Sequence, residues 1–427
     1  MFDRLFVPDE IRAAVSDGAW LQAMLDAERA LALAEAKAGV IPPDAADGIA
    51  SACDAARYDP AELAERGRSS GNPVEPLVRA LAEAAGEAGR FVHWGATSQD
   101  VLDTAAMLVA RDTVALIREP LDRAAEACAA LADAHRATPM VGRTLLQQAV
   151  PTTFGAKAAA WLTGLLDARD DLAALEFPAQ LGGAAGTLAP LGDAGPEVLR
   201  LFADELGLSV RPVPWHTIRT PVARLAGALD LAAGVASKIA LDLLLLAQTE
   251  VGEVRESSGG ASSTMPQKQN PIDSTLSIAC ARVAHGYATT LTGGLAQEHE
   301  RAVGAWHAEW PSLTGALAYA GGAVAAVSRA LDGLEVDIDA MRRNLELTRG
   351  AILGERVTFL LAERIGRRAA HELVAAATER AAASGRSLRE ELEQEVELPG
   401  EAFDRESAVA SATAVVDQAL ERYGAVR

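Results

Sequence analysis

Residues 219–247 read RTPVARLAGALDLAAGVASKIALDLLLLA, an unbroken stretch rich in alanine and leucine. Both residue types favour helix over sheet. The most apolar part, Ile239 to Ala247, contains Asp242 and is too short and too polar to cross a membrane, so it predicts a helix buried on most sides. Segments of the same kind predict further long helices, and the five expected ranges are 103–135, 152–174, 219–255, 272–294 and 312–333.

The rest of the chain predicts shorter helices, and no convincing strand alternation appears in the long-helix region. A first helix should follow Ser16, because apolar residues recur there at steps of three and four, and it should end at Gly39. We therefore expect an all-α fold with an N-terminal helical domain (1–102), a central long-helix bundle (103–345) and a small C-terminal helical domain (346–427). Apolar stripes on several faces of the long helices indicate packing against other subunits.

The charge balance excludes some partners. The chain has 39 basic and 59 acidic residues, a net charge of −20, which argues against nucleic acid and against an anionic membrane surface. A small anionic ligand stays compatible, because a local group of cations can invert the field in one cleft. The isolated Cys53, Cys128 and Cys280 and the absence of a visible signal peptide predict a cytoplasmic protein with buried, reduced thiols.

The loop from Ser258 to Pro271, SGGASSTMPQKQNP, combines hydroxyls, small residues and one lysine between two long helices. Such a set can grip an anion and hold a basic oxygen beside it, although a plain connector has a similar composition. The loop resembles the signature loop of the fumarase/aspartase superfamily, G-S-S-x-M-P-x-K-x-N-P, with Ala261 in place of a glycine. The resemblance implies that Ser262 is the general base, with Ser263 as its competitor, and that Lys268 binds a substrate carboxylate. It implies that Ser263, Thr264, Met265 and Asn270 line the site.

A second segment, His93 to Asp100 (HWGATSQD), precedes a long helix. Hydroxyls and N–H groups at a helix N-terminus make a carboxylate site, and an ordinary helix cap is the alternative. The segment resembles the T-S-x-D region of the same superfamily, which implies that His93, Thr97 and Ser98 contact the substrate.

A third segment, Gly142 to Thr152 (GRTLLQQAVPT), offers an arginine fork and several hydrogen-bond donors. A helix entry with a surface arginine is the alternative. The segment resembles the G-R-T-H region of the superfamily, but Leu145 stands where many of its lyases have histidine. Cycloisomerases of the superfamily also lack that histidine and carry a Leu-Gln-Gln run. The substrate-binding residues implied here are Arg143, Thr144, Gln147 and Gln148.

Two further strings are similar to those of the cycloisomerases. They are PWHT with Arg219, at residues 214–219, and EHER followed by WHAEW, at residues 298–310. They imply that His216, Arg301, His307 and Glu309 lie near the site, although each residue alone is more often structural. The glycine-rich turn 180–187 lacks the strand–helix context of a nucleotide site, and no His/Glu spacing demands a metal.

Taken together, the resemblance implies a fumarase/aspartase-like enzyme without cofactor or metal. It implies a homotetramer, with a core of packed bundles and active sites assembled from three chains. The activity implied is conversion of 3-carboxy-cis,cis-muconate to 4-carboxymuconolactone by intramolecular carboxylate addition. Gln267-Lys268-Gln269 departs from the usual His-Lys-Arg of cycloisomerase loops. A C–N or C–O lyase acting on another succinyl-type substrate is therefore the alternative, and a catalytically silent scaffold is a third hypothesis.

Overall fold

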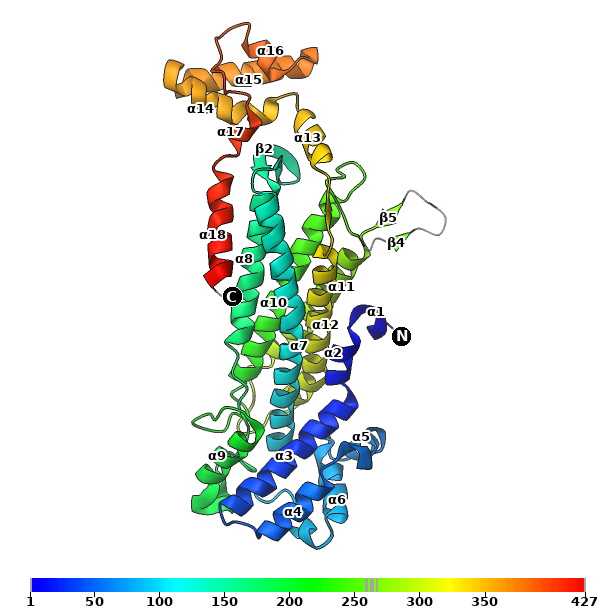
Figure 1. Ribbon diagram of the computed structural model, residues 1–427. Helices are drawn as coiled ribbons and strands as arrows, with labels where there is room; N and C mark the ends of the chain where they lie inside the picture. Colours follow the sequence, from blue (N-terminus) through cyan, green and yellow to red (C-terminus); the bar gives the residue numbers. More distant parts are fainter. Residues whose placement is uncertain (1, 258–259, 262–264, 266–267, 426–427) are drawn as a thin grey trace. The chain divides into compact units, whose positions relative to one another are not determined.

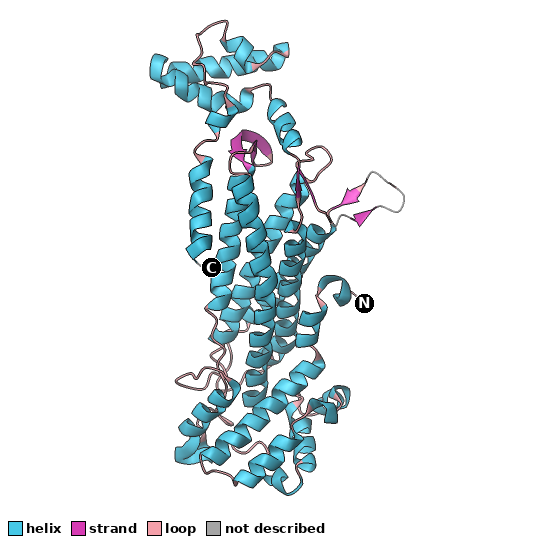
Figure 2. Cartoon of the chain, in the orientation of Figure 1, coloured by secondary structure: helices cyan, strands magenta, loops and turns pink. Residues whose placement is uncertain are grey.

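The computed structural model of the chain describes residues 2–257, 260–261, 265 and 268–425. Helices dominate it and strands are few and short (Figure 2), which confirms the all-α prediction. Among the described residues, no helix is both long enough and apolar enough to span a bilayer.

The N-terminal part consists of short helices around one longer helix, α3 (Asp17–Lys37). Ser16 caps α3 by accepting a hydrogen bond from the N–H of Ala19, and the buried face of the helix carries the predicted apolar stripe. The other elements of this part are α1 (Asp3–Phe6), α2 (Asp9–Ala14), α4 (Pro43–Ala52), η1 (Ala55–Arg57), α5 (Pro60–Gly67), α6 (Val74–Ala84) and η2 (Gly86–Phe91).

Five long helices form where the alanine- and leucine-rich segments predict them (Figure 1). They are α7 (Ser98–Ala134), α8 (Phe154–Ala173), α10 (Thr220–Leu246), α11 (Ile272–Gly293) and α12 (Ala305–Leu331). A connection with η3 (Ala189–Ala194) and α9 (Gly195–Leu206) joins α8 to α10. The prediction for α10 extended too far, because the helix ends at Leu246 and the chain then enters a turn.

In the part of the chain that the structure describes, three small antiparallel pairs of strands interrupt the helices, which corrects the expectation that this region has no strands. The largest pair joins β1 (Pro139–Thr144) to β2 (Gln147–Thr153). The second pairs β3 (Val254–Arg255) with β6 (Glu335–Val336), and the third pairs β4 (Gly260–Ala261) with β5 (Gln269–Asn270).

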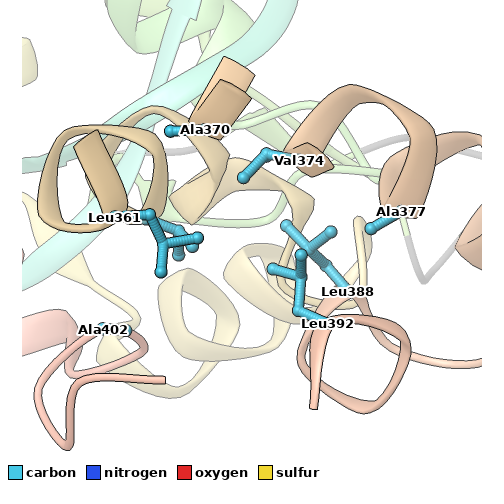
Figure 3. Packing of buried hydrophobic residues seen from close by; sticks show 8 residues of the cluster. Leu361, Ala370, Val374, Ala377, Leu388, Leu392 and Ala402 are labelled. Atoms are coloured by element: carbon cyan, nitrogen blue, oxygen red, sulfur yellow. The ribbon is translucent and has the colours of Figure 1, made fainter. Parts of the chain in front are cut away.

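The C-terminal part has an apolar core of its own, shown in Figure 3. Leu361, Leu388 and Leu392 are fully buried there and pack with Val357 and Ala370. The elements of this part are α13 (Ile338–Glu346), η4 (Ala351–Leu353), α14 (Gly354–Ile365), α15 (Arg367–Ser384), α16 (Leu388–Leu392), α17 (Arg405–Ala408) and α18 (Ala412–Ala425).

Two compact units divide the chain. Unit 1 comprises residues 1–120, 168–234 and 276–325, and unit 2 comprises residues 121–167, 235–275 and 326–427. The start of α7 therefore belongs to unit 1, whereas the β1–β2 hairpin and the base of the signature loop belong to unit 2. The three domains with boundaries after residues 102 and 345 stay a prediction.

Candidate active site

The start of α7 is organised by a buried carboxylate in unit 1. Asp100 accepts hydrogen bonds from the backbone N–H groups of Thr97 (3.0 Å), Gly182 (2.9 Å) and Gly183 (2.9 Å). Asp100 occupies the third position of the helix and binds the N–H that precedes it, which is one half of a capping box. Because Asp100 satisfies the backbone, the hydroxyls of Thr97 and Ser98 are left half-buried and available to a ligand.

The glycine-rich turn 182–186 packs closely against this helix start. Gly183 has a φ of +70°, and a Cβ atom there would come within 3.0 Å of the carbonyl oxygen of Gly95. Only glycine tolerates both the left-handed backbone and this approach. The turn therefore has a structural role in shaping the helix start.

His216 lies behind Asp100. Its Nε2 atom is 2.7 Å from Oδ1 of Asp100, and the side chain is buried. Nε2 of His216 thus contacts the carboxylate that organises the start of α7, and a contact of His216 with substrate stays a prediction.

A buried ion triad ties three segments of unit 1 together. Arg219 donates to Asp103 through both terminal nitrogens (2.7 and 2.9 Å) and to Glu309 (2.6 Å). The indole N–H of Trp306 also donates to Asp103 (3.0 Å). Burial raises the pKa of Glu309, and the Arg219 charge partly offsets this rise. The triad fixes α7, the start of α10 and the start of α12 to one another.

His93 lies just before α7 and is backed by a buried acid from α3. Its Nδ1 atom is 2.6 Å from Oε1 of Glu28, whose side chain is 0% exposed, while the His93 side chain is 18% exposed. His93 has a φ of +60°, which is uncommon for a residue other than glycine and is typical of functional sites.

The remaining predicted residues of unit 1 lie near the start of α12. Arg301 donates to the backbone carbonyl of Ala184 (3.1 Å), in the glycine-rich turn. His307 is exposed and its ring packs on Trp306 and Trp310, with centroid distances of 5.2 and 4.8 Å. His307 therefore presents an imidazole to solvent, whereas Arg301 is anchored to protein.

In unit 2 the third predicted segment forms the β1–β2 hairpin instead of a helix entry. Thr144 pairs with Gln147, and both side chains are exposed near the hairpin tip. Gln148 donates to the carbonyl of Asn344 (3.3 Å). At the tip, Leu145 and Leu146 are 97% and 72% exposed.

The guanidinium of Arg143 is paired within the chain. It makes a bidentate ion pair with the buried carboxylate of Glu253, at 2.8 and 2.9 Å. Asn344 also donates to Glu253 (2.7 Å). The guanidinium of Arg143, which the sequence predicts to bind a substrate carboxylate, thus pairs with Glu253. This ion pair links the hairpin to the segment that leads into the signature loop.

A second buried acid closes the base of that loop. Glu256 accepts hydrogen bonds from the N–H groups of Asp273 (3.1 Å) and Ser274 (2.9 Å), at the start of α11. Asn270 lies on the returning strand β5, and Lys268 directly precedes that strand. Both residues line a groove of about 1060 Å³ that also includes Arg255 and Arg342. Met265 is 41% exposed, while Ser262, Ser263 and Thr264 lie outside the described residues.

No metal centre is found in the described ranges, where no group of three His, Cys, Asp or Glu side chains could hold an ion. The partners that sequence reasoning missed are acids: Glu28, Glu253 and Glu256. Glu28 had a detectable signal, because it lies four residues after Met24 on the apolar stripe of α3 and an acid on a buried face needs a partner. Glu253 and Glu256 do not interrupt an apolar stripe in the sequence. They lie at and just after the end of a range predicted as one long helix (219–255), so nothing marked them as buried acids.

Comparison with known proteins identifies the family to which the chain belongs. A family model described as Lyase matches residues 7–286. The chain belongs to this lyase family, within the fumarase/aspartase superfamily.

Individual relatives are similar over nearly the whole chain. The 3-carboxy-cis,cis-muconate cycloisomerase of Bradyrhizobium diazoefficiens is 49% identical over 392 residues, which cover 90% of this chain and 87% of the relative. The nitrosuccinate lyase of Streptomyces davaonensis is 47% identical over 399 residues, which cover 90% and 84%. The crystal structure of 3-carboxy-cis,cis-muconate lactonizing enzyme from Pseudomonas putida matches with a TM-score of 0.92 and 41% identity, covering 99% of this chain and 98% of that one.

Proposed function

We propose that the chain is a cycloisomerase that converts 3-carboxy-cis,cis-muconate to 4-carboxymuconolactone. The observation that carries this proposal is its 49% identity, over 90% of its length, to a relative of that name. Leu145 supports the same activity. Many lyases of the superfamily have a histidine at this position, and leucine has no titratable group with which to transfer a proton in its place.

The reaction is an isomerisation. One carboxylate oxygen of the substrate adds to a double bond, and a proton is delivered to the carbon beside another carboxylate, so no atom or electron is gained or lost. The negative charge that develops at that carboxylate requires fixed donors. The hydroxyls of Thr97 and Ser98 and the ammonium of Lys268 are the donors that we assign to it, and Ser262 is the residue to which we assign the proton transfer.

We further propose that the enzyme is a homotetramer whose sites combine segments of three chains. The exposed Leu145 and Leu146 at the hairpin tip support a second copy in contact there, because large apolar side chains are seldom left this exposed in a folded monomer. Cys53, Cys128 and Cys280 are buried and form no disulfide among the described residues, which supports a cytoplasmic location.

A direct assay tests the activity. Purified protein is mixed with 3-carboxy-cis,cis-muconate, and we expect loss of the conjugated-diene absorbance as the lactone forms. Ser262→Ala should lower kcat by orders of magnitude with the fold intact by circular dichroism, and Ser263→Ala is the matched control that decides which serine moves the proton. Normal turnover by Ser262→Ala would remove that serine from the mechanism.

A C–N lyase is the second candidate, favoured by the 47% identity to a nitrosuccinate lyase and by the loss of arginine at Gln269. The same preparation is therefore assayed with nitrosuccinate, by nitrite release, and with adenylosuccinate and argininosuccinate. Turnover of one of these substrates without turnover of 3-carboxymuconate would replace the first proposal by this one.

A further inference from the structure

We propose that Glu28 is a positioning residue for His93. It holds the imidazole through Nδ1, so that a protonated Nε2 is offered to a carboxylate of the substrate. The inference rests on the proposed function, because it takes the ligand to be a polycarboxylate. It adds a residue from α3 to the site.

The geometry leaves one free nitrogen on the imidazole. The carboxylate of Glu28 can only accept, so the 2.6 Å contact places a proton on Nδ1. Within the described part of the chain, no hydrogen bond to Nε2 of His93 is found. Glu28 is fully buried and His93 is 18% exposed, so a ligand reaches the pair through the imidazole and not through the acid.

The charges around His93 favour its cationic form. Burial by itself lowers the pKa of His93, but the charge and hydrogen bond of Glu28, followed by the charge of Asp100, raise it above its ordinary value. A cationic imidazole offers a polycarboxylate a charge-assisted hydrogen bond, which is about twice as strong as a neutral one.

Two titratable groups close to Glu28, Glu35 and Cys53, add no second charge near neutral pH. Burial, then the charge of Glu28, raises the pKa of Glu35 on the same helix to about 9. The same two causes raise the pKa of Cys53, which follows α4, to about 12. On the α7 side His216 contacts Asp100. Glu28 and Asp100 are therefore the acids that set the charge of His93.

The alternative is a merely structural link, in which Glu28 ties the segment before α7 to α3 and the protonation of His93 is irrelevant. The two readings differ in pH dependence. If the cation binds substrate, affinity is present below the raised pKa of His93 and is lost as the pH rises through it. A structural link alone predicts no such limb.

The test uses Glu28→Gln, which keeps the size and an acceptor but removes the charge. The pKa of His93 is measured by NMR on protein labelled at histidine Cε1, with the resonance assigned from its loss in His93→Gln. We expect the pKa of His93 to fall by about one unit or more, as for loss of an opposite charge at this distance. The alkaline limb of kcat/KM should move to lower pH by the same amount, with KM rising roughly tenfold above neutral pH and kcat changing less.

Two controls make the result decisive. Glu28→Asp should restore part of the shift, and Glu35→Gln, two turns along α3, should leave the His93 pKa and the pH profile unchanged. An unchanged pKa in Glu28→Gln, or a rise in KM without a shift of the alkaline limb, would overturn the proposal. If Glu28→Gln does not fold, the wild-type pKa decides: a value at or below about 6.5, the ordinary value, overturns it. The NMR titration needs no substrate, so absent turnover of 3-carboxymuconate would contradict the proposed function without deciding this one.

Discussion

Glu35 lies on the buried face of α3, and neither of its carboxylate oxygens has a hydrogen-bond partner among the described residues. Burial, then the charge of Glu28, raises the pKa of this acid from 4.5 to about 9. Between these values the folded chain holds a proton that the unfolded chain has released. The stabilising contribution is therefore complete below the lower pKa and is lost as the pH rises toward the higher one.

Glu35→Gln should remove this pH dependence. In the wild type this group alone should lower the free energy of unfolding by about 1.4 kcal/mol for each unit of pH between the two values. Denaturant unfolding at about pH 6 and about pH 8 measures the slope. The exposed Glu83→Gln is the matched control and should keep the wild-type slope. Equal slopes in both variants would contradict the assignment of the pH dependence to Glu35.

The pair of Arg143 and Glu253 predicts strong coupling between the two side chains. Removing either partner leaves the other charge partly buried, so Arg143→Met and Glu253→Gln should each destabilise the fold by about 3 kcal/mol. The double variant should cost much less than the sum, because the second change removes a charge that is already unpaired. Denaturant unfolding of the four proteins gives the coupling, and additive costs would show that the pair is not formed in solution.

The base of the signature loop is held by a side-chain cap on the helix that follows it. Glu256 satisfies two N–H groups of the first turn of α11, which have no partner inside the helix. The same carboxylate thereby joins the strand that leads into the loop to the helix that follows it. Asn270 lies on the returning strand β5, which directly precedes this helix start, so we expect the contact of Glu256 to help fix its position.

Glu256→Ala should loosen this base. We expect faster hydrogen exchange at the amides of Asp273 and Ser274, a loss of about 1–3 kcal/mol of stability for the unsatisfied groups, and a reduced kcat. Glu250→Gln, an exposed acid that lines the same groove, is the control and should change neither. Unchanged exchange at both amides in Glu256→Ala would contradict the role of Glu256.

The helices could be predicted from the sequence because their signals are local. The stripe of α3 and the alanine- and leucine-rich runs place the long helices, yet the start of α12 was missed by seven residues. Pro311 looks like a first helical residue, but α12 begins at Ala305 and contains Pro311. The hairpin was missed because its two-residue turn is Leu145-Leu146 and not the Asn-Gly type that marks such turns.

The candidate site was predicted in part for the same reason. Thr97 directly precedes α7 and Ser98 is its first residue, and that relation is readable from neighbouring residues. The pairing of Arg143 with Glu253 joins residues 110 positions apart in the chain, and that of His93 with Glu28 joins residues 65 positions apart. Pairs of this kind depend on tertiary packing. A single sequence therefore identifies the candidate side chains but not the residues with which they pair.

The proposed sharing of active sites among chains can be tested with two residues that we assign to the site, His93 and Ser262. If the two come from different chains at each site, co-refolding His93→Gln with Ser262→Ala should restore activity. An equal mixture should regenerate roughly a quarter of the wild-type sites, because random assembly of a symmetric oligomer pairs two intact segments at that frequency.

The control for this experiment is the doubly substituted chain, His93→Gln/Ser262→Ala, refolded with either single variant, which should stay inactive. Persistent inactivity of the mixed single variants would place both residues of a site in one chain.

The hairpin tip has an evolutionary consequence. Leu145 and Leu146 have φ values of +50° and +65°, and a left-handed backbone costs a leucine roughly 1–2 kcal/mol. Asparagine followed by glycine would form the same turn without that cost. Selection for the stability of an isolated chain alone would therefore favour asparagine and glycine at this turn. We expect the two leucines to be kept only where their contacts in the proposed oligomer contribute more stability than the left-handed backbone costs.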